Sequence, residues 1–370
     1  MDNQTNKKFI YGASYLGIAL AELFDEQNIE YDFIDAYAPR DRVLGKYMFR
    51  PEEITAKDKT EATIYIAVLL PPLAPDVDEV LYEELSNMGF TNLIAPFEVM
   101  AIFPEALKKV ASDGLLWRKP DDKDYINQQA FETVIQYFDD DRSKNLLENI
   151  YNFRKNCDVK NYIRTDFGEE YFPENIDLSA GFKALHVLDC GAFDGDTITQ
   201  FFNKLGNSIR SYKAFEPELE NYNQLIKVAS NVKNNYLNAS INCFPMGVGN
   251  TNKVIRFSSG DGAASHISDE GDSEIFIVKL DDSFACSEVN LIKIDVEGAD
   301  LDVINGASKI IKQQKPNIAV SCYHHPAHIW QIPQALKSLN PNYQMYLRQH
   351  GHHGFELTLY CIDSSRINNT

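Results

Sequence analysis

The chain lacks long hydrophobic runs and has little positive charge for its 370 residues. Its longest apolar stretch, residues 64–70, is far shorter than the about 20 apolar residues that a membrane-spanning helix needs. The polar residues 1–8 lack the apolar segment of a secretory signal peptide. With 35 Lys and Arg against 54 Asp and Glu, the formal net charge is −19, and no basic patch stands out. These absences predict no membrane span and no nucleic-acid partner.

Cysteine is scarce and never arranged in pairs. None of the six cysteines belongs to a Cys-x-x-Cys motif, and four of them fall in or beside apolar stretches: Cys190, Cys243, Cys322 and Cys361. Single buried thiols are typical of a reducing compartment, because structural disulfides persist in oxidising ones. We therefore expect a cytoplasmic protein, and its length is sufficient for two domains with large cores.

What the chain does have is a strand, a glycine turn and a helix over residues 185–205. An apolar run ends in Asp189, which is followed by Gly191 and Gly195. Apolar residues then recur at the spacing of a helix face: Ile198, Phe201, Phe202 and Leu205. Glycine lets the backbone approach a ligand closely, and a helix N-terminus offers unpaired N–H donors. The alternative is a glycine turn that serves packing alone.

The next strand, residues 211–215, ends in Glu216 and Pro217, and Glu216 comes 27 residues after Asp189. An acidic side chain at this point can accept hydrogen bonds from both hydroxyls of a ribose. A glycine turn, a helix and an acidic strand end at this spacing predict a nucleotide-like cofactor on a doubly wound sheet.

The glycine turn is acidic, since it carries Asp189, Asp194 and Asp196. Three carboxylates would repel a pyrophosphate, whereas they suit the amino group and the sulfonium charge of S-adenosyl-L-methionine. The residues expected to contact this cofactor are Asp189, Gly191, Ala192, Phe193, Asp194, Gly195, Thr197, Glu216, Pro217, Met246, Gly247 and Asp295.

Two later strands are expected to end at the same edge of the sheet. The third, predicted over residues 243–248, carries Met246 and Gly247 at the position that flanks the base of a nucleotide. The fourth ends in Asp295, with Glu297 two residues further on. Ligands of open α/β sheets bind outside the carboxyl ends of the strands, so Asp295 should lie near the reactive end of the cofactor.

The fifth strand, predicted over residues 317–322, is followed by His324 and His325, with His328 close behind. A metal site is one interpretation, because His324 and His328 are four residues apart and two carboxylates are expected nearby. Pro326 disfavours a regular helix there, so we predict no metal. A strand-end histidine titrates near neutrality, so His324 is expected to act either as a general base or as a substrate-binding residue. Asp295 is the other candidate for the base, and His325 and Glu297 are expected substrate contacts.

The first 110 residues repeat the strand, glycine turn and helix in a small βαβαβ pattern. Gly12 and Gly17 give G-x-x-x-x-G, which lacks the middle glycine of the dinucleotide-binding fingerprint. With Asp35 at the end of its second strand, this Rossmann-like domain either holds a nucleotide ribose or serves in assembly or substrate docking.

Residues 111–177 form a predicted helical connector, with helices over residues 125–138 and 143–153. The charged residues 139–142 between them are expected to be a solvated turn or helix cap rather than a metal site. Residues 258–273, rich in glycine and serine, interrupt the helical pattern within a predicted hairpin. This stretch is either a mobile lid over the substrate or an ordinary surface hairpin.

These pieces together resemble the FkbM family of S-adenosylmethionine-dependent methyltransferases from about residue 171 to residue 362. The resemblance is carried by the sequence at residues 189–196, 215–217, 293–299 and 323–324, and the Lys-Ile-Asp-Val-Glu-Gly stretch is its most specific part. It implies the class I methyltransferase sheet, doubly wound, seven-stranded and ordered 3-2-1-4-5-7-6. It also implies O-methylation, often of sugars and secondary metabolites.

The predicted fold class is therefore α/β: a Rossmann-like domain (residues 1–110), the helical connector (111–177) and a class I methyltransferase domain (178–370). We expect an S-adenosyl-L-methionine-dependent O-methyltransferase that acts on a small-molecule or glycan acceptor, namely a hydroxyl of a sugar, glycan or nucleotide-sugar-like molecule, and a homo-oligomer stays open. The alternatives are an N-methyltransferase for an amino sugar, an NAD(P)-dependent sugar-nucleotide oxidoreductase, and a non-catalytic binding protein on the same fold.

Overall fold

The computed structural model describes residues 6–39, 42–69, 77–112, 125–163, 165, 168–258, 266–267 and 273–367. The chain divides into two compact units. Unit 1 comprises Met1–Ile126, Glu148–Thr165 and Gly351–Phe355, and unit 2 comprises Asn127–Leu147, Asp166–His350 and Glu356–Thr370. The domain boundaries predicted at residues 110 and 177 stay predictions.

Unit 1 is built on a five-stranded parallel sheet in the order β3-β2-β1-β4-β5. The strands are β1 (Lys8–Tyr11), β2 (Asp32–Ile34), β3 (Met48–Phe49), β4 (Thr63–Ile66) and β5 (Leu93–Ile94). The helices are α1 (Tyr15–Glu26), α2 (Ala56–Glu61), α3 (Val77–Asn87), α4 (Pro96–Ile102) and α5 (Pro104–Ser112). The small βαβαβ pattern is present, and β3 is too short to carry a periodicity, so no pattern predicts it.

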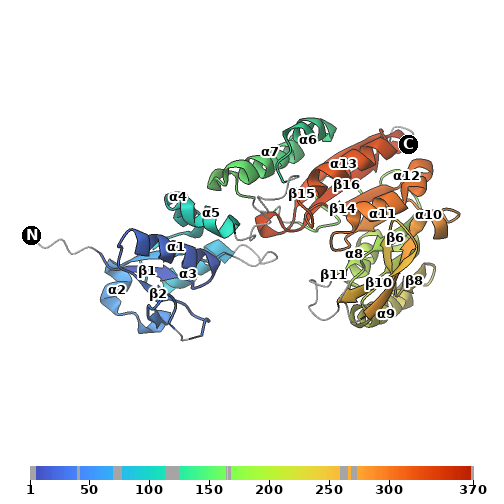
Figure 1. Cartoon of the computed structure of the whole chain (residues 1–370). Coiled ribbons are helices and arrows are strands. Elements are labelled where there is room, and N and C mark those ends of the chain that lie inside the picture. The colour runs from blue at the N-terminus through green and yellow to red at the C-terminus, as the bar shows by residue number, and fades with distance from the viewer. Residues whose placement is uncertain are drawn as a thin grey trace, which may run out of the picture. The chain divides into compact units, whose positions relative to one another are not determined.

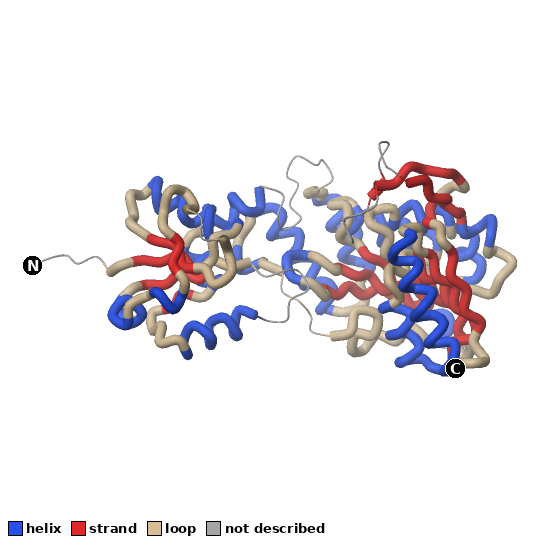
Figure 2. The backbone as a smooth tube through the Cα atoms, turned by 90° about the horizontal axis from the view of Figure 1, so that it is seen from below, coloured by secondary structure: helices blue, strands red, loops and turns tan. Residues whose placement is uncertain are grey.

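Both faces of this sheet are covered, as the alternation of side chains along β1 requires. Phe9 and Tyr11 belong to one buried cluster with Leu85 of α3. Ile10 belongs to another cluster with Leu20 of α1 and with side chains of α4 and α5. Figure 2 shows the strands as a central layer between helices.

Unit 2 is built on a seven-stranded sheet in the order β15-β16-β14-β13-β6-β7-β8. The strands are β6 (Leu185–Cys190), β7 (Ile209–Phe215), β8 (Ser240–Phe244), β13 (Leu291–Ile294), β14 (Asn317–Ser321), β15 (Tyr343–Gln349) and β16 (Leu357–Asp363). Five strands run parallel, and β16 is antiparallel to both β14 and β15. Counted from β6, this is the order 3-2-1-4-5-7-6 read from the opposite edge, so the predicted fold class is confirmed.

The helices of unit 2 are α8 (Asp196–Leu205), α9 (Leu219–Asn235), α10 (Leu280–Ser283), α11 (Asp300–Gly306), α12 (Ser308–Gln314), α13 (His328–Leu339) and α14 (Ser364–Ile367). Helices α8 and α9 pack with Val187 and Tyr212 in one buried cluster (Figure 1). Ile292 and Ile294 alternate with Leu291 of that cluster and so face the other side, and α11 and α12 each contact α13. The sheet is doubly wound.

A separate four-stranded sheet has the order β11-β10-β12-β9. It contains β9 (Gly247–Gly249), β10 (Lys253–Ser258), β11 (His266–Ile267) and β12 (Ser273–Lys279). The predicted hairpin is the antiparallel pair β10 and β12. The third strand ends earlier than predicted, at Phe244, because the chain turns at Pro245 and Gly247 joins this second sheet. Residues 259–265 and 268–272 of the predicted lid lie outside the described residues.

The two helices predicted in the connector are present as α6 (Gln128–Val134) and α7 (Asp141–Asn156). Asp140 precedes α7, and its Oδ1 accepts the N–H of Ser143 at 2.8 Å. Its other oxygen lies 2.5 Å from the guanidinium of Arg348. The charged residues 139–142 therefore include a helix cap. Across the described parts of the chain, every helix is too short or too polar to cross a membrane.

Candidate active site

The glycine turn after β6 meets the turn after β13 backbone to backbone. Gly191 has φ +82°, and a Cβ built on it would lie 1.8 Å from the carbonyl oxygen of Asp295. The N–H groups of Gly191 and Ala192 both donate to the carbonyl of Phe215, at 3.0 and 2.9 Å. Only glycine fits at residue 191, because the space that a side chain would need is filled by the neighbouring strand end.

Two non-glycine residues adopt left-handed backbone conformations at this edge. Phe193 in the first turn has φ +46°, and Glu297 in the second has φ +51°. Such conformations cost energy for residues with a side chain, and they concentrate at ligand-binding and catalytic turns. Phe193 remains 41% exposed, so its ring is available to a ligand.

Glu216 connects the end of β7 to the glycine turn. Its Oε2 accepts the N–H of Phe193 at 3.0 Å, and its Oε1 accepts the N–H of Glu218 at 2.8 Å. Burial raises the pKa of Glu216 to about 7, although both N–H groups favour the charged form. The side chain is only 6% exposed. Glu216 therefore follows β7 as predicted and binds the backbone of the glycine turn, and its contact with a ribose stays a prediction.

The three aspartates of the turn have different surroundings. Asp189 is fully buried, its Oδ2 accepts the hydroxyl of Tyr212 at 2.7 Å, and its Oδ1 lies 3.4 Å from Nζ of Lys293. Asp194 and Asp196 are exposed, and Asp196 accepts the N–H of Thr197 at 2.6 Å at the start of α8. Asp189 is therefore a support beneath the turn rather than a surface that a ligand can touch.

Lys293 links these groups. It is 3% exposed, and its Nζ donates to the carbonyl of Gly191 at 2.5 Å while facing Asp189. Burial alone would lower the pKa of Lys293, but the carboxylates of Asp189, Asp295 and Glu170 outweigh it and keep the amine charged. The lysine thus fixes the glycine turn against β13.

The remaining predicted cofactor contacts lie on both sides of Glu216. Pro217 follows it, and a Cβ on Gly247 would lie 3.9 Å from Cβ of Pro217. The N–H of Met246 donates to Phe244 at 2.9 Å in the turn after β8. Ala192 and Thr197 are buried, and Gly195 has φ +98° at the start of α8. The structure brings Gly247 beside Pro217, and contact of Met246 and Gly247 with the base of a cofactor stays a prediction.

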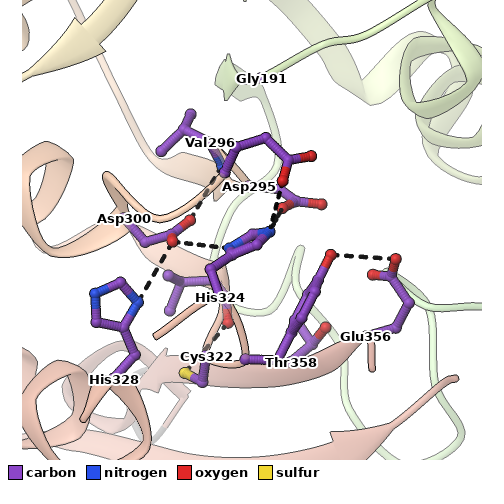
Figure 3. Close-up of polar contacts among 12 residues, drawn as sticks. Gly191, Asp295, Val296, Asp300, Cys322, His324, His328, Glu356 and Thr358 are labelled. Atoms are coloured by element: carbon purple, nitrogen blue, oxygen red, sulfur yellow. Dashed lines mark hydrogen bonds and ion pairs between the residues drawn. The ribbon is translucent and has the colours of Figure 1, made fainter. Parts of the chain in front are cut away.

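His324 lies between carboxylates at the carboxyl ends of β13 and β14 (Figure 3). Its Nδ1 is 3.0 Å from Oδ2 of Asp300, and its Nε2 is 3.4 Å from both Oδ1 of Asp295 and Oε2 of Glu297. The imidazole is 6% exposed, and Nε2 makes no hydrogen bond within the described residues. The predicted pair of Asp295 and His324 is therefore brought together.

The carboxylates set the charge of this imidazole. Burial alone would lower the pKa of His324, but the hydrogen bond and charge of Asp300, followed by Asp295 and Glu297, raise it to about 9. Burial raises the pKa of Asp295, and it raises that of Glu297 to about 7. In the ligand-free protein, His324 therefore carries a proton at neutral pH.

A second group of carboxylates surrounds Asp295 from the other side. Oxygen atoms of Glu170, Asp295 and Glu356 all lie within 4.8 Å of one another. Glu356 accepts the hydroxyl of Tyr323 at 3.2 Å, and burial raises the pKa of Glu356 to about 9. No periodicity or motif in the sequence marks Glu170 or Glu356, so only the fold reveals that they belong to this site.

The segment after His324 differs from one expectation, that Pro326 disfavours a helix there. His325 is exposed, its Nδ1 accepts the N–H of Ala327 at 3.1 Å, and its ring centroid is 5.5 Å from that of His328. His328 begins α13 despite Pro326, because the proline precedes the helix rather than interrupting it. Substrate contacts by His325 and Glu297 stay predictions.

Asp295, Asp300 and His324 also offer ligand atoms within 4.8 Å of one another, a spacing compatible with a metal ion. The two aspartates, however, face opposite nitrogens of one imidazole ring. Asp300 holds Nδ1 as a hydrogen-bond acceptor, whereas Asp295 and Glu297 lie at Nε2. The expectation that no metal is bound stays a prediction.

Comparison with known proteins identifies the fold that carries this site. The chain is similar in structure to the crystal structure of methyltransferase FkbM from Methylobacillus flagellatus KT, with a TM-score of 0.64 and 19% sequence identity. The similarity covers 96% of this chain and 90% of that chain, and at this identity it concerns the fold. A comparison with curated proteins gives no match. The family model described as the methyltransferase FkbM domain matches residues 189–354. The resemblance stated from the sequence is thus confirmed for residues 189–354, which match the methyltransferase FkbM domain, and for the fold.

Proposed function

We propose that the chain is an S-adenosyl-L-methionine-dependent O-methyltransferase that acts on a hydroxyl of a sugar or glycan. The observation that carries the proposal is the contact between Gly191 and Asp295, because it joins the turn for a cofactor to the strand end that bears the reactive side chains. In open α/β sheets, ligands bind at this edge.

The residues fit the proposed cofactor. Glu216 retains lone pairs for the hydroxyls of a ribose beside the N–H groups of Phe193 and Glu218 that it already accepts. The turn after β8, with Met246 and Gly247, would flank the base. The carboxyl groups of Asp295, Glu170 and Glu356 lie within 4.8 Å of one another, and a positively charged ligand would favour their ionised forms. When bound, the cofactor supplies a methyl group on a sulfonium.

The same carboxyl groups restrict the chemical class of acceptor that the site can bind. A nucleotide sugar would bring a pyrophosphate, which negatively charged side chains repel. An uncharged sugar or glycan hydroxyl meets no such penalty. We therefore favour a phosphate-free acceptor over a nucleotide-sugar-like one.

His324 and Asp295 would handle the proton of the acceptor hydroxyl. Nε2 of His324 faces Asp295 and makes no hydrogen bond within the described residues, so it is placed to accept a proton once the imidazole is neutral. Its pKa of about 9 in the ligand-free protein opposes this role at pH 7. A positive charge near the imidazole lowers its pKa, so a bound sulfonium would favour the neutral base. Asp295 would stabilise the imidazolium after proton transfer.

The test uses the full chain, the cofactor and a panel of neutral sugars and oligosaccharides. Calorimetry should detect cofactor binding, and release of the demethylated cofactor should report turnover. His324→Ala should lower the methyl-transfer rate by roughly 10²–10⁴-fold and leave cofactor affinity nearly unchanged. His186→Ala is the matched control, because His186 lies at the start of β6 and contacts Ser211 instead. Absence of cofactor binding to folded protein would overturn the proposal.

A further inference from the structure

Asp300 is a buried charged group beside His324 to which the proposed reaction gives no role. We infer that Asp300 is a positioning residue: it holds His324 with a proton on Nδ1, so that Nε2 faces the acceptor as the basic atom. The inference rests on the proposed function for its catalytic part, whereas the state of the imidazole can be measured without cofactor or acceptor.

The geometry begins with the burial of Asp300, whose side chain is 0% exposed at the start of α11. Its Oδ1 accepts the N–H of Val296 at 3.1 Å, and its Oδ2 lies 3.0 Å from Nδ1 of His324. Nδ1 of His328, in the first turn of α13, is 3.5 Å from the same oxygen. Figure 3 shows the carboxylate between the turn after β13 and the two histidines. Because both of its oxygens have partners, the carboxylate of Asp300 is held in one orientation.

The charge of Asp300 fixes the tautomer of His324. Burial would raise the pKa of Asp300, but the hydrogen bonds from His324 and His328 outweigh it and hold that pKa well below its ordinary range. An ionised carboxylate can only accept hydrogen bonds, so the proton must sit on Nδ1 of His324. When His324 is neutral, its lone pair is then on Nε2, which faces Asp295 and Glu297.

A purely structural role is the competing interpretation, since Asp300 also ties the turn at Val296 to α13. The two roles predict different things. If Asp300 has only a structural role, its neutralisation lowers the stability of the protein and leaves the pKa of His324 unchanged, because the other neighbours of the imidazole set that pKa. A positioning residue changes both the pKa and the preferred tautomer of that imidazole when it is neutralised.

Other charged groups also face His324 and limit the size of the change. Asp295 and Glu297 lie at Nε2, and Glu356 contributes from the segment before β16. Lys293, in β13, acts in the opposite direction on the surrounding carboxylates. Removing the charge of Asp300 should therefore lower the pKa of His324 without returning it to that of a buried histidine with no acidic neighbours.

The experiment compares the full-length protein with Asp300→Asn by NMR of ¹⁵N-labelled histidine across a pH series. The pKa of His324 should fall by roughly 1–3 in Asp300→Asn, because an opposite charge at hydrogen-bond distance is lost. Asp302→Asn is the matched control: it makes the same change on the same helix, and its carboxylate contacts Asn250 instead. An unchanged pKa in folded Asp300→Asn would overturn the inference.

The wild-type protein provides an independent criterion if Asp300→Asn does not fold. At a pH above the pKa of His324, the ¹⁵N shifts should show the proton on Nδ1 and a bare Nε2. A neutral imidazole protonated on Nε2 would overturn the inference without any variant.

The pH dependence of methyl transfer then tests the catalytic part. In Asp300→Asn the acidic limb of the rate profile should move to lower pH, in step with the NMR pKa, while the plateau rate falls. Loss of the correct tautomer in a comparable aspartate–histidine pair costs up to ~10⁴-fold. A lower rate with an unmoved limb would indicate a brace and overturn the inference. If the pKa of His324 falls in Asp300→Asn as expected, but the wild-type protein transfers no methyl group to any acceptor, the proposed function alone would be contradicted.

Discussion

The two units contain the same local arrangement around a glycine turn. In unit 1, Gly12 has φ +101° after β1, and Oδ2 of Asp35 accepts the N–H of Ala13 at 3.0 Å. In unit 2, Gly191 has φ +82° after β6, and Oε2 of Glu216 accepts the N–H of Phe193 at 3.0 Å. In both, the acidic residue ends the neighbouring strand and holds the turn by its backbone.

The next strand distinguishes the two units. Beside the turn of unit 1, β4 is followed by Ala67 and Val68, whose backbone and methyl groups face Gly12. Beside the turn of unit 2, β13 is followed by Asp295, whose carboxylate faces His324. A glycine turn with an acidic strand end is thus a property of the fold, while the chemistry depends on what the adjacent strands carry.

The largest difference is expected from adding one methyl group to each turn. Gly191→Ala puts Cβ 1.8 Å from a backbone oxygen, and at Gly12 the nearest backbone oxygen is 3.0 Å away. Positive φ costs roughly 1–2 kcal/mol in either variant, and overpacking adds roughly 1–3 kcal/mol more. Gly191→Ala should therefore abolish cofactor binding in calorimetry, whereas Gly12→Ala should destabilise only unit 1. Equal cofactor affinity in both variants would contradict the assignment of the cofactor to unit 2.

The acidic strand ends offer a second, smaller comparison. Glu216→Ala removes a charge-assisted acceptor from the proposed ribose site, so cofactor affinity should fall by roughly 1.5–3 kcal/mol, or about tenfold to more than a hundredfold. Asp35→Ala is the same change in unit 1 and should leave that affinity unaltered. Both are measured as dissociation constants by calorimetry on proteins whose melting confirms folding. A loss of cofactor affinity in Asp35→Ala but not in Glu216→Ala would indicate that the cofactor binds unit 1.

The two sheets and the places of Asp295 and His324 follow from the sequence because each strand ends at a short, recognisable motif. In the seven-stranded sheet the strands have four to seven residues, long enough for apolar runs to mark them, whereas β3 of unit 1 is too short to be predicted. A parallel sheet then brings successive strand ends to one edge, so Glu216, Asp295 and His324 converge without any knowledge of contacts. Periodicity and topology together carry this part of the prediction.

The parts that sequence reasoning misses depend on long-range contacts. Asp300 fits a helix cap by its position, yet its carboxylate turns back to Val296 and His324. Glu170 and Glu356 come from segments with no motif and are 186 residues apart in the sequence. The fold brings their carboxyl groups together beside Asp295. The third strand ends early because Gly247 pairs with Ile277 in another sheet, a choice that local patterns do not encode.

The smallest expected difference concerns pH. In unit 2, the pKa values of Glu216 and Glu170 are raised from 4.5 to about 7, mainly by burial, and that of Glu356 is raised to about 9. The pKa of His324 is raised from 6.5 to about 9. Each shift makes the folded unit bind more protons than the unfolded chain. The carboxyl groups lose their stabilising contribution as pH rises from 4.5 through their folded values, and His324 loses its contribution between 6.5 and 9.

All these groups therefore act in one direction, and ligand-free unit 2 should become less stable from pH 5 to pH 9. In unit 1, burial raises the pKa of Tyr11 to about 12, which lies outside this window. Hydrogen exchange, corrected for its intrinsic pH dependence, should show protection falling in β6 and α8 while β1 and α1 change less. Each kcal/mol lost lowers the melting temperature of a unit of this size by roughly 2–4 °C.

A bound sulfonium favours the ionised carboxylates, so saturating cofactor should make the loss of stability with rising pH less steep. Equal loss of protection in both units, or a slope that the cofactor leaves unchanged, would contradict the charge distribution assigned to the two turns.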